Sequence, residues 1–144
     1  MSFPATDRIK HWYETQEIHF AVARPGGEVA IGIAPVAEFL DDNLLKLRVP
    51  QTVWGVVKGF LAVNPWIALH PGGLGAVKAP YQLKGLVRPV EAAPQAPEQE
   101  IVIDLRELYI TKPGPEAGQR VDHWTKAELT EFERSLGWLT EENK

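Results

Sequence analysis

Cysteine is absent from this chain of 144 residues, and methionine occurs only once. Without cysteine there are no disulfides, no thiolate metal sites and no cysteine nucleophile. No apolar run approaches the ~20 residues of a membrane-spanning helix. Residues 1–12 also lack the cationic and apolar segments of a secretory signal. We therefore expect a cytoplasmic protein that does not associate with membranes.

Positive charge is scarce as well. Lysine and arginine number 15 against 19 aspartates and glutamates, which gives a formal net charge of −4. No basic run offsets this balance, so the sequence argues against nucleic-acid binding. An apolar content of 44% and a charged content of 24% are typical of globular proteins. The length favours a single domain over residues 1–144.

Most signatures of catalysis are missing. The four histidines show neither helical ligand spacing nor a pattern with carboxylates, so the sequence predicts no metal site. No glycine-rich loop leads from a strand into a helix with a phosphate-binding lysine. The adjacent carboxylates Asp41 and Asp42 are better explained as turn formers, because such side chains bond to the local backbone. The sequence therefore assigns no catalytic residue.

Turn residues between apolar runs predict an antiparallel meander over residues 18–50. Its middle strand alternates bulky and small side chains, so one face is almost bare. A bare strand face allows something flat, or another backbone, to approach closely. The bulky positions are Val29, Ile31 and Ile33, and the small ones are Ala30, Gly32 and Ala34.

Helices are expected at three places. Residues 7–16 carry an apolar stripe at helical spacing, with Thr6 as the N-cap. Thr52 is expected to cap a second helix that ends at Asn64-Pro65. Thr125 and Glu128 match a capping box at the start of a C-terminal helix, within residues 124–139.

Further strands are expected at residues 66–70, 80–90 and 101–110, and residues 91–99 are expected to form an exposed loop rich in proline and alanine. The chain therefore has about six strands and short flanking helices. A closed or partly closed barrel leaves such a set of strands with few exposed edges. The predicted fold is mainly β, a small antiparallel barrel.

Three cations are candidates for binding an anion. Lys46 and Arg48 point the same way from one strand, and Lys58 lies on the helix that follows. The start of that helix presents free amides and a positive dipole end, and Gln51 and Thr52 add neutral donors there. These residues would surround a phosphate. The alternative is a solvated strand face and helix surface.

Two further residues are candidates for the surroundings of a ligand. Trp54 is one of five tryptophans, which are too many for one small core, so some are expected in a ligand slot or a subunit interface. His70 falls on a predicted strand. It is either a hydrogen-bonded structural histidine or a proton donor beside a bound ligand.

The order of these features resembles the pyridoxamine 5′-phosphate oxidase-like family of FMN-binding split barrels. The resemblance covers roughly residues 18–121, and its order and spacing carry more than any single motif. The matching positions are Gly26-Gly27, Pro35, Asp41-Asp42, Leu61, Asn64-Pro65 and Lys84-Gly85.

The resemblance implies a six-stranded antiparallel Greek-key split barrel and a homodimer with FMN between the subunits. It places the flavin phosphate near the end of the third strand and the start of the following helix, where Arg48, Gln51, Thr52 and Lys58 stand. One departure concerns the polar pair expected about eight residues before Asn-Pro, where this chain has Val56 and Val57. Either neighbouring residues hold the phosphate or FMN affinity has been lost.

The leading hypothesis is thus an FMN-binding oxidoreductase or electron-transfer protein whose substrate and redox partner are unidentified. Trp54 and His70 would lie near the flavin ring. The alternative is a non-catalytic dimer of the same fold that binds another planar ligand, haem or a deazaflavin, or that acts as a structural or sensory module. The substrate-binding arginine and histidine motif of a true pyridoxamine phosphate oxidase is not evident, so that activity is not predicted.

Overall fold

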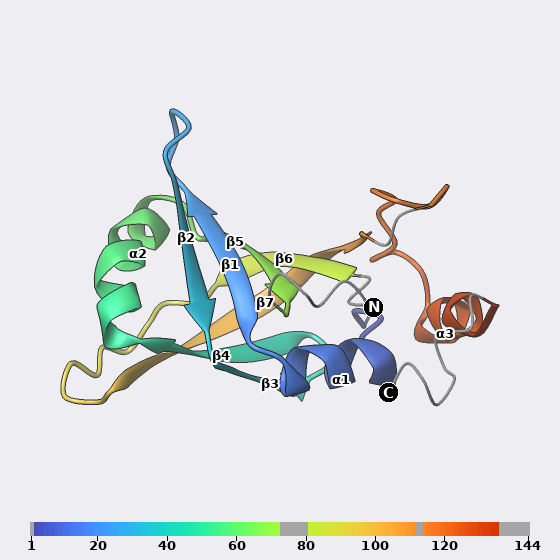
Figure 1. Cartoon of the computed structure of the whole chain (residues 1–144), viewed down its shortest axis with the longest axis horizontal. Coiled ribbons are helices and arrows are strands. Elements are labelled where there is room, and N and C mark those ends of the chain that lie inside the picture. Colours follow the sequence, from blue (N-terminus) through green and yellow to red (C-terminus); the bar gives the residue numbers. More distant parts are fainter. Residues whose placement is uncertain (1, 73–80, 112–113, 136–144) are drawn as a thin grey trace.

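A computed structural model describes residues 2–72, 81–111 and 114–135. Within these ranges the chain forms one seven-stranded antiparallel sheet and three helices (Figure 1). The helices are α1 (Asp7–Thr15), α2 (Gln51–Val63) and α3 (Lys126–Ser135). The strands are β1 (Ile18–Ala23), β2 (Val29–Ala34), β3 (Val36–Asp41), β4 (Leu44–Pro50), β5 (Trp66–Pro71), β6 (Tyr81–Val87) and β7 (Glu98–Ile110).

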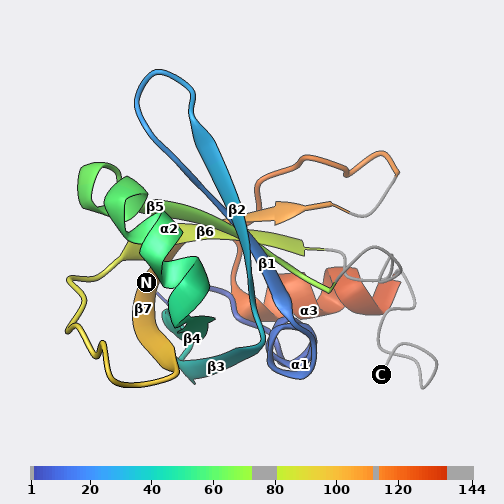
Figure 2. The same ribbon diagram turned by 60° about the vertical axis from the view of Figure 1, so that its left-hand side comes forward.

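The sheet curls because its two end strands are joined by one residue. The strand order is β2-β1-β5-β6-β7-β4-β3, so β2 and β3 lie at opposite ends. Only Pro35 separates Ala34 of β2 from Val36 of β3. The two ends must therefore meet at Pro35, and the sheet bends into a half-barrel (Figure 2). Helix α2 packs against β1, β2 and β4.

The predicted fold class, a mainly β antiparallel split barrel with short flanking helices, is confirmed. The described residues hold seven strands rather than six, because Pro35 divides the predicted second strand into β2 and β3. Proline has no amide hydrogen to donate to a ladder, so the strand breaks there. The predicted loop at residues 91–99 is confirmed over 91–97, since β7 begins at Glu98.

Two of the three predicted helix starts are confirmed. The Thr6 hydroxyl accepts a hydrogen bond from the Ile9 amide at 3.2 Å. At α3, the Thr125 and Glu128 side chains each accept from the other residue's amide, which is the reciprocal pattern of a capping box. The proposed Thr52 cap is wrong: α2 begins at Gln51 after Pro50, with no side-chain cap, so Thr52 lies inside the first turn. Residues 136–139 of the predicted C-terminal helix lie outside the described residues.

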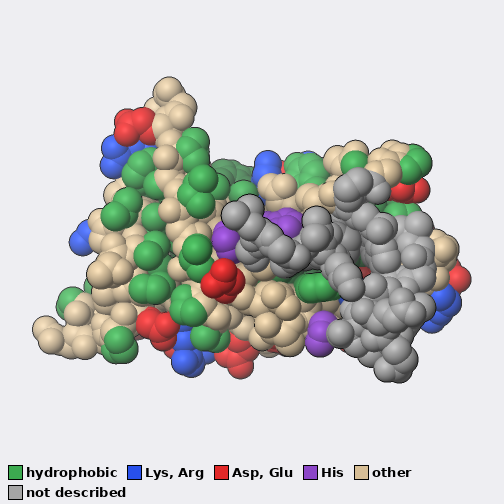
Figure 3. Space-filling view, in the orientation of Figure 1, with side chains coloured by type: hydrophobic (Ala, Val, Ile, Leu, Met, Phe, Trp, Pro, Cys, Tyr) green, Lys and Arg blue, Asp and Glu red, His purple; other side chains and the backbone are tan. Residues whose placement is uncertain are grey.

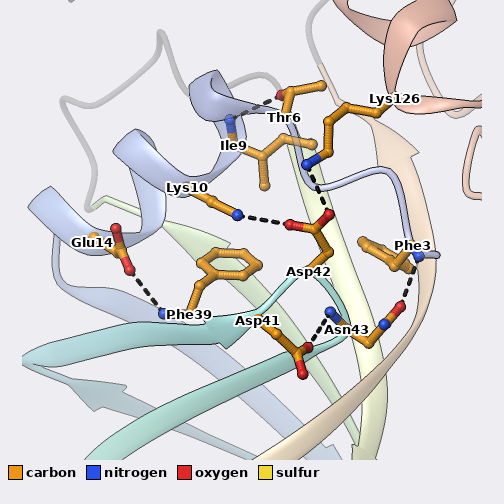
Figure 4. A network of polar contacts seen from close by, with 10 residues as sticks. All are labelled: Phe3, Thr6, Ile9, Lys10, Glu14, Phe39, Asp41, Asp42, Asn43 and Lys126. Atoms are coloured by element: carbon orange, nitrogen blue, oxygen red, sulfur yellow. Dashed lines mark hydrogen bonds and ion pairs between the residues drawn. The ribbon is translucent and has the colours of Figure 1, made fainter.

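The turn between β3 and β4 joins three parts of the chain (Figure 4). The Asp41 carboxylate accepts from the Asn43 amide at 2.7 Å, as expected of a turn former. The Asp42 carboxylate instead forms ion pairs with Lys10 of α1 and Lys126 of α3, each at 2.7 Å. Asn43 in turn accepts from the Phe3 amide. The turn therefore holds α1, α3 and the N-terminal segment together.

A buried carboxylate ties α3 to the barrel. Glu133 is 1% exposed and accepts hydrogen bonds from the hydroxyls of Thr6, at 2.8 Å, and Tyr81, at 2.5 Å. Burial raises the pKa of Glu133, although both hydrogen bonds and the nearby Arg8 guanidinium act in the opposite direction. A glutamate at this position is expected on a solvated helix face, so the sequence pattern did not indicate this contact.

Gly85 of β6 is required by the close approach of β7. A Cβ atom at this position would lie 2.4 Å from the Asp104 carbonyl oxygen and 2.6 Å from Ile103 Cγ2. Gly55, in contrast, lies in α2 with nothing within 4 Å of an added Cβ. The two glycines therefore make a matched pair for substitution by alanine.

We predict that Gly85→Ala lowers the free energy of unfolding by about 1–3 kcal/mol. The added methyl group would clash with backbone atoms of β7, which can move only if the strand itself shifts. Gly55→Ala is expected to raise it by up to about 1 kcal/mol, because alanine has the higher helix propensity. Urea denaturation of both variants checks the pair. A neutral Gly85→Ala variant contradicts the strand packing described here.

The Asp42 ion pairs predict a pH-dependent stability. Hydrogen bonds from Lys10 and Lys126 lower the pKa of Asp42 below its ordinary value of 3.8, so the native state binds this proton less tightly than the unfolded chain. The stabilisation is complete above pH 3.8 and disappears as the pH falls through the lowered value. We expect Asp42→Asn to lower the free energy of unfolding by about 0.5–1 kcal/mol at pH 7 and to change it little below the lowered pKa. Denaturant midpoints of the wild-type protein and the variant, measured at pH 7 and at a pH below the lowered pKa of Asp42, test this prediction. A destabilisation of the variant that persists at the lower pH contradicts it.

Candidate functional site

The two predicted strand cations are neutralised by neighbouring carboxylates. The Lys46 ammonium lies 3.1 Å from Glu38 and 3.9 Å from Glu100. Arg48 Nε lies 3.5 Å from the same Glu100 carboxylate. Lys46 and Arg48 thus share a face, as predicted, but glutamates of the neighbouring strands balance much of their positive charge. Arg48 also lines a hollow of about 670 Å³ beside the loop at residues 89–97.

Gln51 fastens that loop to the start of α2. Its side-chain amide donates to the Ala93 carbonyl at 2.8 Å, and its backbone amide donates to the Pro97 carbonyl at 3.1 Å. The side-chain amide and the backbone amide of Gln51 each therefore donate a hydrogen bond within the protein. Thr52, the next predicted site residue, is exposed on the first turn of the helix.

Trp54 and Lys58 do come together. They line a groove of about 520 Å³ between α2 and residues 87–90, which we call the α2 groove. Lys58 is exposed and has no ion-pair partner among the described residues. Arg88, which the sequence analysis did not single out, lines the same groove and forms two 3.0 Å hydrogen bonds with Asp104. That pairing raises the pKa of Arg88 and lowers that of Asp104.

His70 lies on a different surface from these residues. It is half-buried on β5, and in the register of the sheet it stands opposite His19 of β1, which stands opposite Ile33 of β2. His19 is held by Glu17, with 3.2 Å between Nε2 and the carboxylate. The structure therefore places His70 on the outer face of the sheet and not in the α2 groove.

The predicted bare face of β2 is not available to a ligand. Gly32 and Ala34 are buried, and an added Cβ at Gly32 would lie 2.5 Å from the Phe20 ring and 2.8 Å from Val53 of α2. The small side chains do permit a close approach, as expected, but the groups that approach are the Phe20 ring and Val53 of α2 and not a planar ligand. The bulky face points outward instead: Ile31 is 75% exposed and Val29 is 60% exposed.

A bare floor exists on the neighbouring strands. The register puts Ala21 of β1 opposite Ala68 of β5, and Ala23 follows Ala21 on the same face. These three alanines lie in a hollow of about 310 Å³, with Val29 and Trp66 also lining it. We call this hollow the trough. Sequence reasoning missed it because Ala21 and Ala68 are far apart in the chain and only strand pairing brings them together.

The Asn64–Trp66 segment borders both the trough and the α2 groove. Asn64 and Trp66 line the trough, whereas Pro65 between them lines the α2 groove. The Asn64 side chain donates to the Ala23 carbonyl at 3.1 Å and accepts from the Trp66 amide at 3.3 Å. The Asn-Pro motif thus anchors the end of α2 to Ala23 of the trough, and its proline lines the α2 groove.

An apolar surface borders the trough. Figure 3 shows hydrophobic side chains over α2 and β2 on one face of the molecule. The large exposed apolar residues of the described chain, which we call the apolar surface, are Val29, Ile31, Ile33, Val36, Leu40, Val56, Val63 and Trp66. Exposed apolar side chains that gather on one face are typical of a place where a ligand or another protein binds.

Within the described residues, no three histidine, aspartate or glutamate side chains are placed to hold a metal ion. Nor is any helix among them long and apolar enough to cross a membrane. What the outer face offers is a flat apolar floor, an aromatic side chain and nearby cations. That combination suits a planar ligand with an anionic group.

No protein-family model and no curated protein matches the sequence. Solved structures do resemble the fold. HupZ of Group A Streptococcus aligns with a TM-score of 0.60 and 16% identity, over 78% of this chain and 98% of that one. A candidate pyridoxamine 5′-phosphate oxidase from Lactobacillus delbrueckii gives a TM-score of 0.60 and 12% identity over 72% and 92%. An FMN-binding protein from Syntrophomonas wolfei gives 0.51 and 6% over 74% and 82%.

Flavin reductases are also among the similar structures. This chain has the split-barrel fold of these flavin proteins. The resemblance to pyridoxamine 5′-phosphate oxidase-like proteins is thereby confirmed at the level of the fold, although the identities are low. The ligand has to be argued from the residues of this chain.

Proposed function

We propose that this protein binds FMN, with the flavin ring on the alanine floor of the trough and the phosphate in the α2 groove. The observation that carries this proposal is the Asn64–Trp66 segment, which borders both hollows, with a flat apolar floor in one and Lys58 in the other. Methyl groups at Ala21, Ala23 and Ala68 leave room for a ring to lie against the sheet.

Bound FMN would supply two-electron redox chemistry, and the protein would supply position and electrostatics. The proposed activity is that of an FMN-dependent oxidoreductase or electron-transfer protein. Lys58 would pair with the phosphate dianion, and Trp54 in the same groove would cover the ribityl chain. Arg48 could join them only by giving up its contact with Glu100. Together with Gln51, Thr52 and His70, it stays a prediction from the sequence.

We also propose a homodimer. The apolar surface includes Val29, which lines the trough, and its strand neighbours Ile31 and Ile33. A second copy resting on these residues would bury them and would roof the trough. Covering the ring in this way would exclude water from the redox site and so limit side reactions there.

FMN titration followed by flavin fluorescence tests the ligand. We expect saturable binding and a yellow protein. Ala68→Phe fills the floor and should weaken FMN and riboflavin binding at least tenfold, whereas Ala127→Phe at an exposed position of α3 should not. Lys58→Ala should weaken FMN by about 1–3 kcal/mol and leave riboflavin, which has no phosphate, unchanged. A colourless protein that ignores saturating FMN contradicts the proposal.

The dimer is tested separately by sedimentation equilibrium. Ile31→Glu places a charge on the apolar surface and should shift the protein from dimer to monomer without unfolding it, because Ile31 is 75% exposed. Arg106→Glu, an exposed change on β7, is the matched control and should leave the dimer intact. A wild-type protein that stays monomeric at high concentration rules the homodimer out.

A further inference from the structure

One end of the trough carries a lysine and a glutamate side by side. Lys84 of β6 and Glu107 of β7 are partners in the register of the sheet, and both line the trough. The same row of the sheet runs from Ala21 to Ala68 and then to Lys84 and Glu107. A flat ring lying on the two alanines therefore directs its edge toward this pair.

The strand pairing is irregular beside Lys84 and Glu107. Lys84 pairs with Glu107 whereas Gly85 pairs with Leu105, so the register shifts between Lys84 and Gly85. Arg106 is thus the extra residue of a β-bulge, a feature that re-aims side chains and is frequent beside functional sites. Gly85 permits β7 to approach closely at this point, since an added Cβ would meet the Asp104 carbonyl.

Neighbouring side chains brace both partners. The Lys84 ammonium lies 5.1 Å from the centre of the Tyr109 ring. The Tyr109 hydroxyl donates to Glu107 Oε1 at 2.6 Å, and Arg120 Nη1 lies 3.7 Å from Glu107 Oε2. Arg120 is held in turn by Asp122 at 2.7 Å. The polar heads are therefore fixed in place by groups outside the trough.

The pair keeps unused hydrogen-bonding capacity. Among the described residues Lys84 forms no ion pair, not even with its register partner Glu107. An ammonium has three donors, and a carboxylate has about four acceptor positions. The contacts with Tyr109 and Arg120 occupy only some of those acceptor positions. A donor and an acceptor thus stand next to each other at the end of an apolar slot.

We propose that Lys84 and Glu107 recognise the imide edge of a planar ring, the sequence C(=O)–NH–C(=O). The Lys84 ammonium donates to a ring carbonyl oxygen, and the Glu107 carboxylate accepts from the ring N–H. This inference rests on the proposed function, because the pyrimidine part of a flavin has such an edge. A deazaflavin has it too, whereas haem has none. The pair therefore selects flavin-type rings among the planar ligands that the sequence leaves open.

Lumiflavin and 3-methyl-lumiflavin test the proposal by fluorescence titration. They share the ring and lack the phosphate, but the methyl group replaces the N–H. We expect wild-type protein to bind lumiflavin at least tenfold more tightly, because the methyl group removes the N–H that donates to Glu107 and places a bulky apolar group against the carboxylate. In Glu107→Ala the preference should fall below twofold, and in the control Glu100→Ala it should persist. Lys84→Met should weaken both ligands alike.

The outcomes separate the two proposals. Equal affinity of wild-type protein for the two rings overturns the imide assignment and leaves FMN binding standing. That comparison needs no variant, so it holds even if Glu107→Ala fails to fold, which circular dichroism reports. A preference that persists unchanged in folded Glu107→Ala also overturns the assignment. Failure to bind FMN, riboflavin and lumiflavin at saturating concentration overturns the proposed function and this inference with it.

Discussion

The single-residue link at Pro35 is the constraint on which the structure depends. It joins strands that occupy opposite ends of a seven-stranded sheet, so the sheet must curl to bring those two strands together. Curling gives every strand an inner and an outer face. Large apolar side chains pack on the inner face together with α2, and the remaining side chains, many of them small or polar, lie on the outer face. The alanine floor, Lys84 and Glu107 all belong to that outer face, which makes the candidate site a consequence of how the barrel closes.

The local elements were largely predictable because their signals are short-range. Thr6 and the Thr125–Glu128 pair mark helix starts through hydrogen bonds within one turn, and the structure has both. Thr52 shows the limit of such reasoning. It has the chemistry of a cap, yet Pro50 already fixes the backbone at the helix entry, and the helix begins one residue before Thr52. Asp42 likewise reads as a turn residue, but its partners lie on α1 and α3.

The site was harder to predict because its parts come from pairing across strands. The alternation of side chains along β2 identified a bare face correctly, but it did not show what packs on that face. Only the three-dimensional packing shows that Phe20 and Val53 lie against Gly32. Cations on a strand were easy to find in the sequence, whereas the glutamates that neutralise Lys46 and Arg48 are supplied by β3 and β7. Ala21 and Ala68 become one surface only through their register. Long-range pairing therefore decides which of the sequence's candidate residues can act together.

The central claim, that a flat ring lies on the alanine floor, is tested most directly by NMR of ¹³C-methyl-labelled alanine during a titration with lumiflavin. Ring-current shifts report a ring stacked on a methyl group. The account predicts large upfield shifts for the methyl groups of Ala21, Ala23 and Ala68, with Ala62 of the α2 groove and Ala127 of α3 unmoved. Saturation of the flavin signal with these three methyl resonances unchanged would show that the ring binds elsewhere and would contradict the account.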